Sequence, residues 1–240
     1  MHYKNWFDDN PNRINDYINY FRGIIAPYLS NVKLCPALDV GCGMGFGMNA
    51  LMSMGYDDVD GVDIDSQQVN ACVKRGLKAY LVDDVIKYLE KKSEHYGVVL
   101  MLDVLEHIPP ENQIDTMKAV YNSLAPMGRV ILTVPNASSI MATRHRYIDY
   151  THYCSFTEHS LSFVLKSAGF ENVIMANRKP IKHISLKLWK AENRRNIRKW
   201  IIRWLWRQVL AEYYGHCEAI DRISLELNIE ALAIKEISKS

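Results

Sequence analysis

A cluster of glycines placed directly after a short apolar segment is the feature that most constrains how this chain can fold. Residues 37–40 read Ala-Leu-Asp-Val, a pattern typical of a buried strand, and four of the twelve glycines fall within residues 41–47. Glycine permits a tight turn and lets a ligand approach the backbone closely. The sequence therefore predicts a strand–loop–helix unit with a ligand at its loop, the alternative being a glycine-rich turn that binds nothing.

Segments with the pattern of strands and of helices alternate along the chain. Strands are expected at residues 37–40, 59–63, 78–82, 98–102, 129–134, 170–176 and 225–237. Helices are expected at residues 11–29, 46–54, 85–92, 111–124 and 157–167, and one more begins after Asp65 as its N-cap. This alternation predicts an α/β fold with a mostly parallel sheet that is covered by helices on both faces.

Composition excludes several classes of protein. A chain that is 48% hydrophobic and 23% charged is not disordered, and no apolar run reaches the about 20 residues that span a membrane. The N-terminus lacks the pattern of a signal peptide. The five cysteines include no C-x-x-C pair, so neither a disulfide framework nor a cysteine zinc site is expected, and the cytoplasm is the expected compartment.

Two acidic residues narrow the choice of ligand for the glycine loop. The glycine spacing does not match G-x-G-x-x-G, because the third position falls on Phe46 or Met48, so an NAD site is excluded. The carboxylate of Asp39 would repel a pyrophosphate but attract a cationic ligand such as an ammonium or a sulfonium. Asp63 ends the second strand, twenty residues after Gly43, where nucleotide-binding α/β folds place an acid that accepts both ribose hydroxyls.

These residues resemble the motifs of class I S-adenosylmethionine-dependent methyltransferases. Asp39-x-Gly41-x-Gly43-x-Gly45 is similar to the first motif of that family, which binds the methionine end of the cofactor, and residues 61–65 resemble the second, in which Asp63 would hold the ribose. Residues 83–85 resemble the acidic segment that holds the adenine. Residues 98–107 are similar to the strand-four motif common in small-molecule methyltransferases, although Gly97 stands where an acidic residue is usual.

The resemblance covers about residues 35–174 and implies a cofactor, a fold and a set of contacts. The implied cofactor is S-adenosyl-L-methionine, and the implied fold is a Rossmann-like sheet of seven strands with a basic helical insertion before the last one. The residues implied to bind the cofactor are Asp39, Gly41, Cys42, Gly43, Gly45, Asp63, Ile64, Asp84, Val85, Asp103 and Val104. We expect a single domain, residues 1–240, made of a helical cap (1–32), a cofactor-binding core (35–176), the insertion (178–217) and a final strand (223–237).

The loop after the fifth strand is expected to face the reactive methyl group, because ligands of open α/β sheets lie beyond the carboxyl ends of the strands. Asp149 and His152 in this loop are predicted to form a carboxylate–imidazole pair in which the histidine removes a proton from a hydroxyl. His107 is the second candidate base. Each histidine has a plainer interpretation, as a loop residue or as part of the pocket lining. Arg144, Arg146 and Tyr147 are candidates for binding an acidic acceptor, unless the arginines are merely solvated.

No metal site is expected from the sequence. The eight histidines show neither H-x-x-x-H nor a mixed Cys/His ligand spacing. The clustered carboxylates and asparagine that bind magnesium in catechol-type enzymes of this fold also have no counterpart.

Positive charge is concentrated in one segment of the chain. Residues 178–207 hold eleven basic residues and one acidic residue, a net charge of +10, so the rest of the chain carries −8. Within it, two helical faces are predicted. One is mostly apolar (Ile197, Trp200, Ile201, Trp204, Leu205 and Gln208) and the other is basic (Arg195, Lys199, Arg203 and Arg207). Packing on the sheet or in a homodimer, docking of residues 186–210 on an anionic membrane, and nucleic-acid binding are the alternatives, the last being least favoured.

The predicted function is O-methylation of a sugar hydroxyl. The loop at residues 149–157 resembles that of methyltransferases from bacterial surface-polysaccharide gene clusters, with a similar Asp-x-Thr-His before the Phe-Thr that opens the next helix. This resemblance implies an acceptor in a surface or lipid-linked glycan such as O-antigen, and an enzyme that is cytoplasmic or peripheral at the inner membrane face. The alternatives are O-methylation of a quinone precursor or other small phenol, and a non-catalytic scaffold that binds membrane or a partner.

Overall fold

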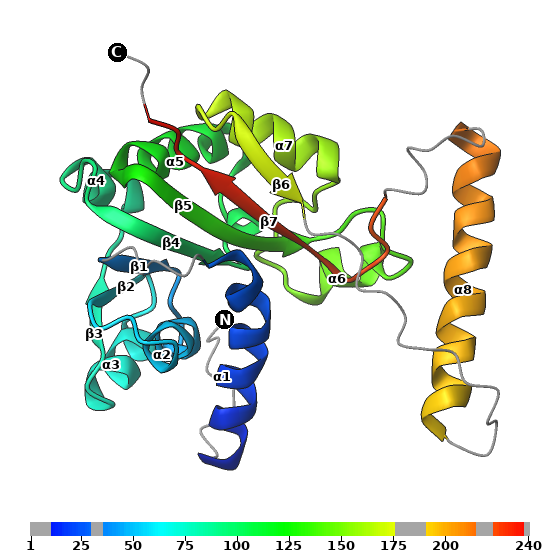
Figure 1. Ribbon diagram of the computed structural model, residues 1–240, viewed down its shortest axis with the longest axis horizontal. Helices are drawn as coiled ribbons and strands as arrows, with labels where there is room; N and C mark the ends of the chain where they lie inside the picture. Colours follow the sequence, from blue (N-terminus) through cyan, green and yellow to red (C-terminus); the bar gives the residue numbers. More distant parts are fainter. Residues whose placement is uncertain (1–10, 30–35, 176–190, 215–222, 238–240) are drawn as a thin grey trace.

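A twisted sheet runs through the centre of the molecule (Figure 1). The computed structural model describes residues 11–29, 36–175, 191–214 and 223–237. Its strands are β1 (Ala37–Val40), β2 (Val59–Asp63), β3 (Lys78–Leu81), β4 (Tyr96–Leu102), β5 (Leu124–Pro135), β6 (Asn172–Met175) and β7 (Asn228–Ile234). Within these residues they form a seven-stranded sheet of order β3-β2-β1-β4-β5-β7-β6, in which β7 alone is antiparallel. The predicted mostly parallel sheet is confirmed.

Helices cover both faces of the sheet, as predicted. The helices of the described residues are α1 (Pro11–Ile25), α2 (Phe46–Ser53), α3 (Ser66–Lys74), α4 (Val85–Glu90), α5 (Pro110–Ser123), α6 (Ala142–Ile148), α7 (Glu158–Ser167) and α8 (Ala191–Tyr214), with 3₁₀ turns η2 (Ala26–Tyr28) and η3 (Leu105–His107). One apolar core packs α4, α5 and α7 against the sheet, and a second packs α1, α2 and α3 against the opposite face. Successive β4 residues alternate between the two cores, with Val99 in the first and Leu100 in the second, because side chains on a strand point to opposite faces.

The clearest differences from the sequence prediction concern three elements. Strand β5 begins at Leu124 and not at residue 129. Strand β4 begins at Tyr96, two residues early, because Tyr96 pairs with Leu124 across an irregularity that takes in Gly97. The loop expected from Pro135 to Phe156 contains α6. This helix has no buried residue, so it carries no apolar periodicity that could have revealed it.

Helix α8 stands beside the sheet (Figure 1), and its apolar residues are exposed. Trp200 and Trp204 are 48% and 49% exposed, and Ile201 and Leu205 are exposed as well. The other side of α8 contacts the rest of the protein. Arg203 forms an ion pair with Glu226 (2.8 Å). Trp206 Nε1 donates a hydrogen bond to the Ser138 carbonyl (3.0 Å), and Arg207 donates one to the Ile223 carbonyl (3.0 Å). The packing of this apolar face on the sheet, one of the predicted alternatives, is therefore wrong for the described residues.

The remaining predictions for the basic segment extend beyond the part of the chain that the structure describes. Residues 178–190 and 215–217 of the predicted insertion, and residues 1–10 and 30–32 of the predicted cap, lie outside it. Among the helices that are described, none has both the length and the apolar character required to cross a membrane.

Candidate cofactor and acceptor site

The residues expected to bind the cofactor gather at the carboxyl edge of the central strands. The glycine loop follows β1, Asp63 ends β2, and Asp103 and Val104 follow β4. β1 lies between β2 and β4 in the sheet, so the three segments converge on one place. This is the edge at which α/β sheets bind ligands.

The glycine loop is held in a conformation that depends on glycine. Gly41, Gly43 and Gly45 all have positive φ, of 67°, 52° and 76°, a region that side chains disfavour. The amide of Gly43 donates a hydrogen bond to Asp63 Oδ2 (2.8 Å). This bond joins the loop of β1 to the end of β2, so the two predicted motifs form one structural unit.

Asp63 is positioned by the backbone on both sides of its carboxylate. Its Oδ1 accepts a hydrogen bond from the Asp65 amide (2.8 Å) while its Oδ2 accepts the bond from Gly43. Burial raises the pKa of Asp63 above its ordinary value, although the two backbone donors oppose this shift. Each carboxylate oxygen has two lone pairs, so the same atoms can also accept hydrogen bonds from a pair of ribose hydroxyls.

Asp39 lies buried beneath the loop, against the first turn of α2. A Cβ atom on Gly47 would come within 2.5 Å of Asp39 Oδ2, so the fourth glycine of the cluster is required for the close approach of this carboxylate to the helix. Burial and the neighbouring Asp63 raise the pKa of Asp39 to about 7. A cationic group beside the loop would restore its ionised form.

The remaining predicted cofactor contacts line the same edge. Asp84 is the N-cap of α4, where its exposed carboxylate accepts a hydrogen bond from the Lys87 amide (3.1 Å) and pairs with the Lys87 ammonium (3.0 Å). Val85 begins α4, and Ile64 is exposed directly after Asp63. The side chain of Cys42 is buried, so this residue could line a ligand only with its backbone.

Asp103 and Val104 form the turn that leaves β4. Asp103 has a positive φ of 56°, which aspartate tolerates better than most residues. Its Oδ1 accepts hydrogen bonds from the Thr133 hydroxyl (2.8 Å) and the Asn228 amide (2.9 Å). A Cβ on Gly41 would come within 2.5 Å of Val104, so this turn packs closely against the glycine loop.

On the acceptor side, the structure pairs Asp149 with His107 and not with His152. Asp149 Oδ1 accepts hydrogen bonds from the amide (2.8 Å) and the hydroxyl (2.7 Å) of Thr151, and the Thr151 hydroxyl contacts His107 Nδ1 (2.8 Å). Since the threonine proton goes to the carboxylate, Nδ1–H of His107 is the donor in the second contact. The predicted direct Asp149–His152 pair does not form in the described residues, because Thr151 bonds to Asp149 Oδ1 and His152 Nδ1 bonds to the His145 carbonyl instead.

His107 and His152 lie together although 44 residues separate them in the sequence. Their ring centroids are 4.6 Å apart, and His152 Nδ1 donates to the carbonyl of His145 in α6 (3.2 Å). Burial and the neighbouring His152 lower the pKa of His107, which favours its neutral form. Burial alone would raise the pKa of Asp149, but the hydrogen bonds from Thr151 and the two imidazoles lower it.

Glu106 is the residue that sequence reasoning missed at this site. It precedes His107 in η3 and is only 1% exposed, and neither of its carboxylate oxygens has a hydrogen-bond partner in the described part of the chain. Burial and the negative charges of Asp103 and Asp149 raise its pKa well above the ordinary value. In the sequence Glu106 stands between Leu105 and His107, and nothing in these neighbours indicates that its carboxylate is buried.

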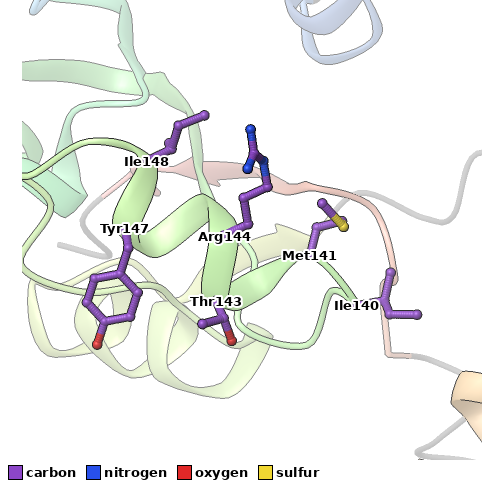
Figure 2. A pocket seen from close by; sticks show the side chains of 6 residues that line it. All are labelled: Ile140, Met141, Thr143, Arg144, Tyr147 and Ile148. Atoms are coloured by element: carbon purple, nitrogen blue, oxygen red, sulfur yellow. The ribbon is translucent and has the colours of Figure 1, made fainter.

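An open surface cleft of about 560 Å³ lies over α6 and is lined by residues of α6 and of the segment before it. Figure 2 shows the side chains of Arg144 and Tyr147, two predicted acceptor contacts, among those that line it. Arg146, the third, instead donates to the Tyr153 carbonyl (2.7 Å) and covers the ring of Tyr147. Arg144 and Tyr147 therefore line this cleft, and their part in binding an acceptor stays a prediction.

Known proteins resemble this chain in structure or in sequence. An Archaeoglobus fulgidus protein described as a SAM-dependent methyltransferase is similar in structure, with a TM-score of 0.65 and 20% identity, and the match covers 91% of this chain and 94% of that one. A tRNA U34 carboxymethyltransferase of Hydrogenovibrio crunogenus is 26% identical over 62% of this chain and 48% of its own length. A ubiquinone biosynthesis O-methyltransferase of Photorhabdus laumondii is 26% identical over 53% of this chain and 50% of its own length. The chain spans about half the length of these two relatives.

A family profile described as "Methyltransferase domain" matches residues 10–174. This match covers the glycine loop, Asp63, the β4 motif and the histidine pair, which together make up the candidate site. The strand order and the carboxyl-edge site agree with it. The chain therefore belongs to the methyltransferase domain family, with the class I fold that uses S-adenosylmethionine as its cofactor.

Proposed function

We propose that this chain transfers the methyl group of S-adenosylmethionine to a hydroxyl of a small acceptor, with a sugar of a surface or lipid-linked glycan as the leading candidate. The observation that carries the proposal is the connected group formed by Asp149, Thr151, His107 and His152, in which His107 follows the carboxyl end of β4. Proton removal from an acceptor requires such a group within reach of the methyl donor.

The described residues fit the cofactor. The glycine loop leaves its backbone open to a ligand, Asp63 can accept from the ribose, and buried Asp39 can neutralise the cationic methionine end. Asp84 and Ile64 are the proposed contacts of the adenine. The cofactor, when bound, supplies an electrophilic methyl group, so the task left to the protein is to align the acceptor and remove its proton.

His152 is the proposed proton acceptor. Its Nδ1–H is used by the His145 carbonyl, so the lone pair is on Nε2. His107 is held in the same tautomer by Thr151, and Asp149 fixes Thr151 in turn. His107 is therefore the positioned neighbour, or the base itself if the acceptor reaches it first.

A small phenol is the second candidate acceptor. It is favoured by the match to the ubiquinone biosynthesis O-methyltransferase, whereas the sugar is favoured by the likeness of the loop at residues 149–157 to polysaccharide methyltransferases. A non-catalytic scaffold is disfavoured because the glycine loop and Asp63 form an intact unit.

Calorimetric titration followed by an acceptor screen tests this proposal. We expect S-adenosylmethionine and its demethylated product to bind, and label from the methyl group to appear in lipid-linked or nucleotide-linked sugars. Label in a polyprenyl phenol would favour the second candidate, and label in tRNA would favour the activity named for the other relative. No heat and no thermal shift at millimolar cofactor would contradict the enzyme proposal as a whole.

We also propose that the exposed apolar face of α8 docks on an anionic membrane. Trp200, Ile201, Trp204 and Leu205 are exposed next to the basic residues Arg195, Arg198 and Lys199, the combination typical of helices that lie in a membrane surface. Arg203 and Arg207 from the predicted basic face turn toward Glu226 and Ile223 instead. A glycan carrier lipid or a quinone precursor would be found at such a surface.

Replacing Arg195, Arg198 and Lys199 by glutamine is expected to weaken binding to anionic vesicles roughly 150-fold. Each basic residue near an anionic surface contributes about 1 kcal/mol, and about 3 kcal/mol corresponds to this factor. Vesicle sedimentation measures the effect, and Trp200→Ala with Trp204→Ala should abolish binding in a protein that stays folded. Loss of an oligomer in the tryptophan variant would favour a homodimer contact, and wild-type protein that ignores anionic vesicles at low salt would refute the membrane proposal.

Cofactor affinity is expected to increase with pH between about 5 and 7 and to level off above. Asp39 has a pKa of about 7 in the free protein, so it is protonated at the lower pH, and a cationic ligand must displace that proton. The gain approaches tenfold per pH unit. Calorimetry in buffers of different ionisation enthalpy should detect one released proton near pH 6, and Asp39→Asn should remove both effects. A flat pH profile for the wild type would show that Asp39 does not meet the charge.

A further inference from the structure

Glu106 presents a problem that the proposed transfer does not resolve. It is buried to 99% between Leu105 and His107, and its two carboxylate oxygens have no hydrogen-bond partner among the described residues. A buried carboxylate without a partner is costly, and such groups are retained when a ligand that satisfies them binds. The turn that carries Glu106 is held in place, because Gln113 in α5 donates hydrogen bonds to the carbonyls of Leu105 (3.1 Å) and Ile108 (3.0 Å).

Two imidazoles face the same point as Glu106. One ligand atom from each of Glu106, His107 and His152 lies within 4.8 Å of the other two. Protein ligands that share one ion at about 2.1 Å are themselves about 3–3.5 Å apart, so small side-chain rotations would bring these three onto a common centre. The residues come from η3 and from the segment after α6, which the hydrogen bond from the Tyr153 amide to the Glu106 carbonyl (2.8 Å) ties together.

The histidines are also oriented as metal ligands are. His152 donates Nδ1–H to the His145 carbonyl, and His107 donates Nδ1–H to Thr151, which Asp149 orients in turn. In metal sites the ligating histidine nearly always donates its other ring N–H to a carboxylate, a backbone carbonyl or a water molecule. This hydrogen bond places the lone pair on the nitrogen that binds the ion. In both histidines the hydrogen bond is made by Nδ1–H, so Nε2 carries the lone pair that could bind an ion.

We propose that Glu106, His107 and His152 form a binding site for a divalent transition-metal ion such as Zn²⁺. Two imidazoles and one carboxylate are a ligand set that suits Zn²⁺, Co²⁺, Mn²⁺ and Fe²⁺ better than Mg²⁺, which prefers oxygen ligands. The positive charge of the ion would satisfy the buried carboxylate. The sequence does not reveal this site, because Glu106 and His107 are adjacent and His152 is 45 residues after His107. This spacing matches no short metal-binding motif.

The consequence for catalysis rests on the proposed function, whereas the binding of the ion does not. Three protein ligands would leave coordination positions open, and an acceptor could take one of them. An acceptor hydroxyl placed there would ionise more readily, and His152 would then act as a ligand and not as the base.

Metal titration of the untagged apoprotein tests the proposal. After removal of metals with a chelator, Zn²⁺ is titrated by calorimetry and Co²⁺ by its visible ligand-field bands. We expect one ion per chain. Glu106→Gln and His152→Ala should each lower the affinity by more than about 100-fold, since even changes to residues behind the ligands cost about 10–100-fold. His159→Ala, which removes an exposed imidazole of α7, should bind the ion as the wild type does.

Several outcomes would overturn the site. These are the absence of both Zn²⁺ heat and Co²⁺ bands, or ion binding that is unchanged in folded Glu106→Gln and His152→Ala. Should Glu106→Gln fail to fold, the half-buried His152 still provides the decisive variant. Titration of S-adenosylmethionine into the same apoprotein keeps the two proposals apart, because cofactor binding without metal binding refutes the metal site and leaves the methyltransferase proposal intact.

Discussion

Replacing His152 with alanine is expected to lower turnover by about 10²–10⁴-fold, the range for loss of a positioned acid–base group. The affinity for S-adenosylmethionine should stay nearly unchanged, because His152 lies on the acceptor side, in contact with His107 and the carbonyl of His145. Single-turnover rates at saturating cofactor measure the first quantity and calorimetry measures the second.

Matched variants identify what His152 does. His159→Ala, a change of the same kind at an exposed position, should retain the wild-type rate. If His152 is the base, chelator-treated wild type keeps its rate. If His152 is a metal ligand, chelator treatment alone reproduces the loss and added Zn²⁺ or Co²⁺ restores the wild type but not the variant. A variant His107→Ala that is inactive beside an active His152→Ala would exchange the two roles.

Replacing Asp63 with alanine is expected to weaken cofactor binding by roughly 2–3 kcal/mol, the contribution of hydrogen bonds to a charged group, or about 30–150-fold. The effect has two sources in the structure. The ribose hydroxyls lose their acceptor, and the Gly43 amide loses the bond of 2.8 Å that holds the glycine loop to β2. Calorimetric titration of the folded variant gives the loss directly.

Two further variants separate these sources. Asp63→Asn keeps an acceptor oxygen but loses the charge, so its loss should fall between those of the wild type and Asp63→Ala. Asp57→Asn removes an exposed carboxylate before β2 and should leave the affinity unchanged. Wild-type affinity in folded Asp63→Ala would show that the ribose is bound elsewhere.

The central part of the fold was predictable because its signals are local. Residues 98–102 form a continuous apolar run and residues 37–40 are apolar except for Asp39, and such segments belong to strands that are buried on both faces. Gly43 and Asp63 were predictable as a pair because strand, loop and acid follow one another at a spacing set by the geometry of a βαβ unit. Helix α6 was not predictable, because it buries none of its residues and so leaves no apolar period.

The amino-acid sequence by itself thus determined the mostly parallel sheet, because local patterns mark its strands, and its motifs indicated the class of cofactor. The residues that would hold the cofactor stay a prediction. Tertiary structure alone decided the partners on the acceptor side. Asp149 and His152 are close in sequence, but the hydroxyl of Thr151 donates a hydrogen bond to the Asp149 carboxylate and accepts one from His107 Nδ1. Asp149 is therefore linked to His107 through Thr151. Glu106 meets His152 only because the chain folds back across the edge of the sheet. Contacts of this kind depend on how distant segments pack, and the spacing of residues along a chain does not encode them locally.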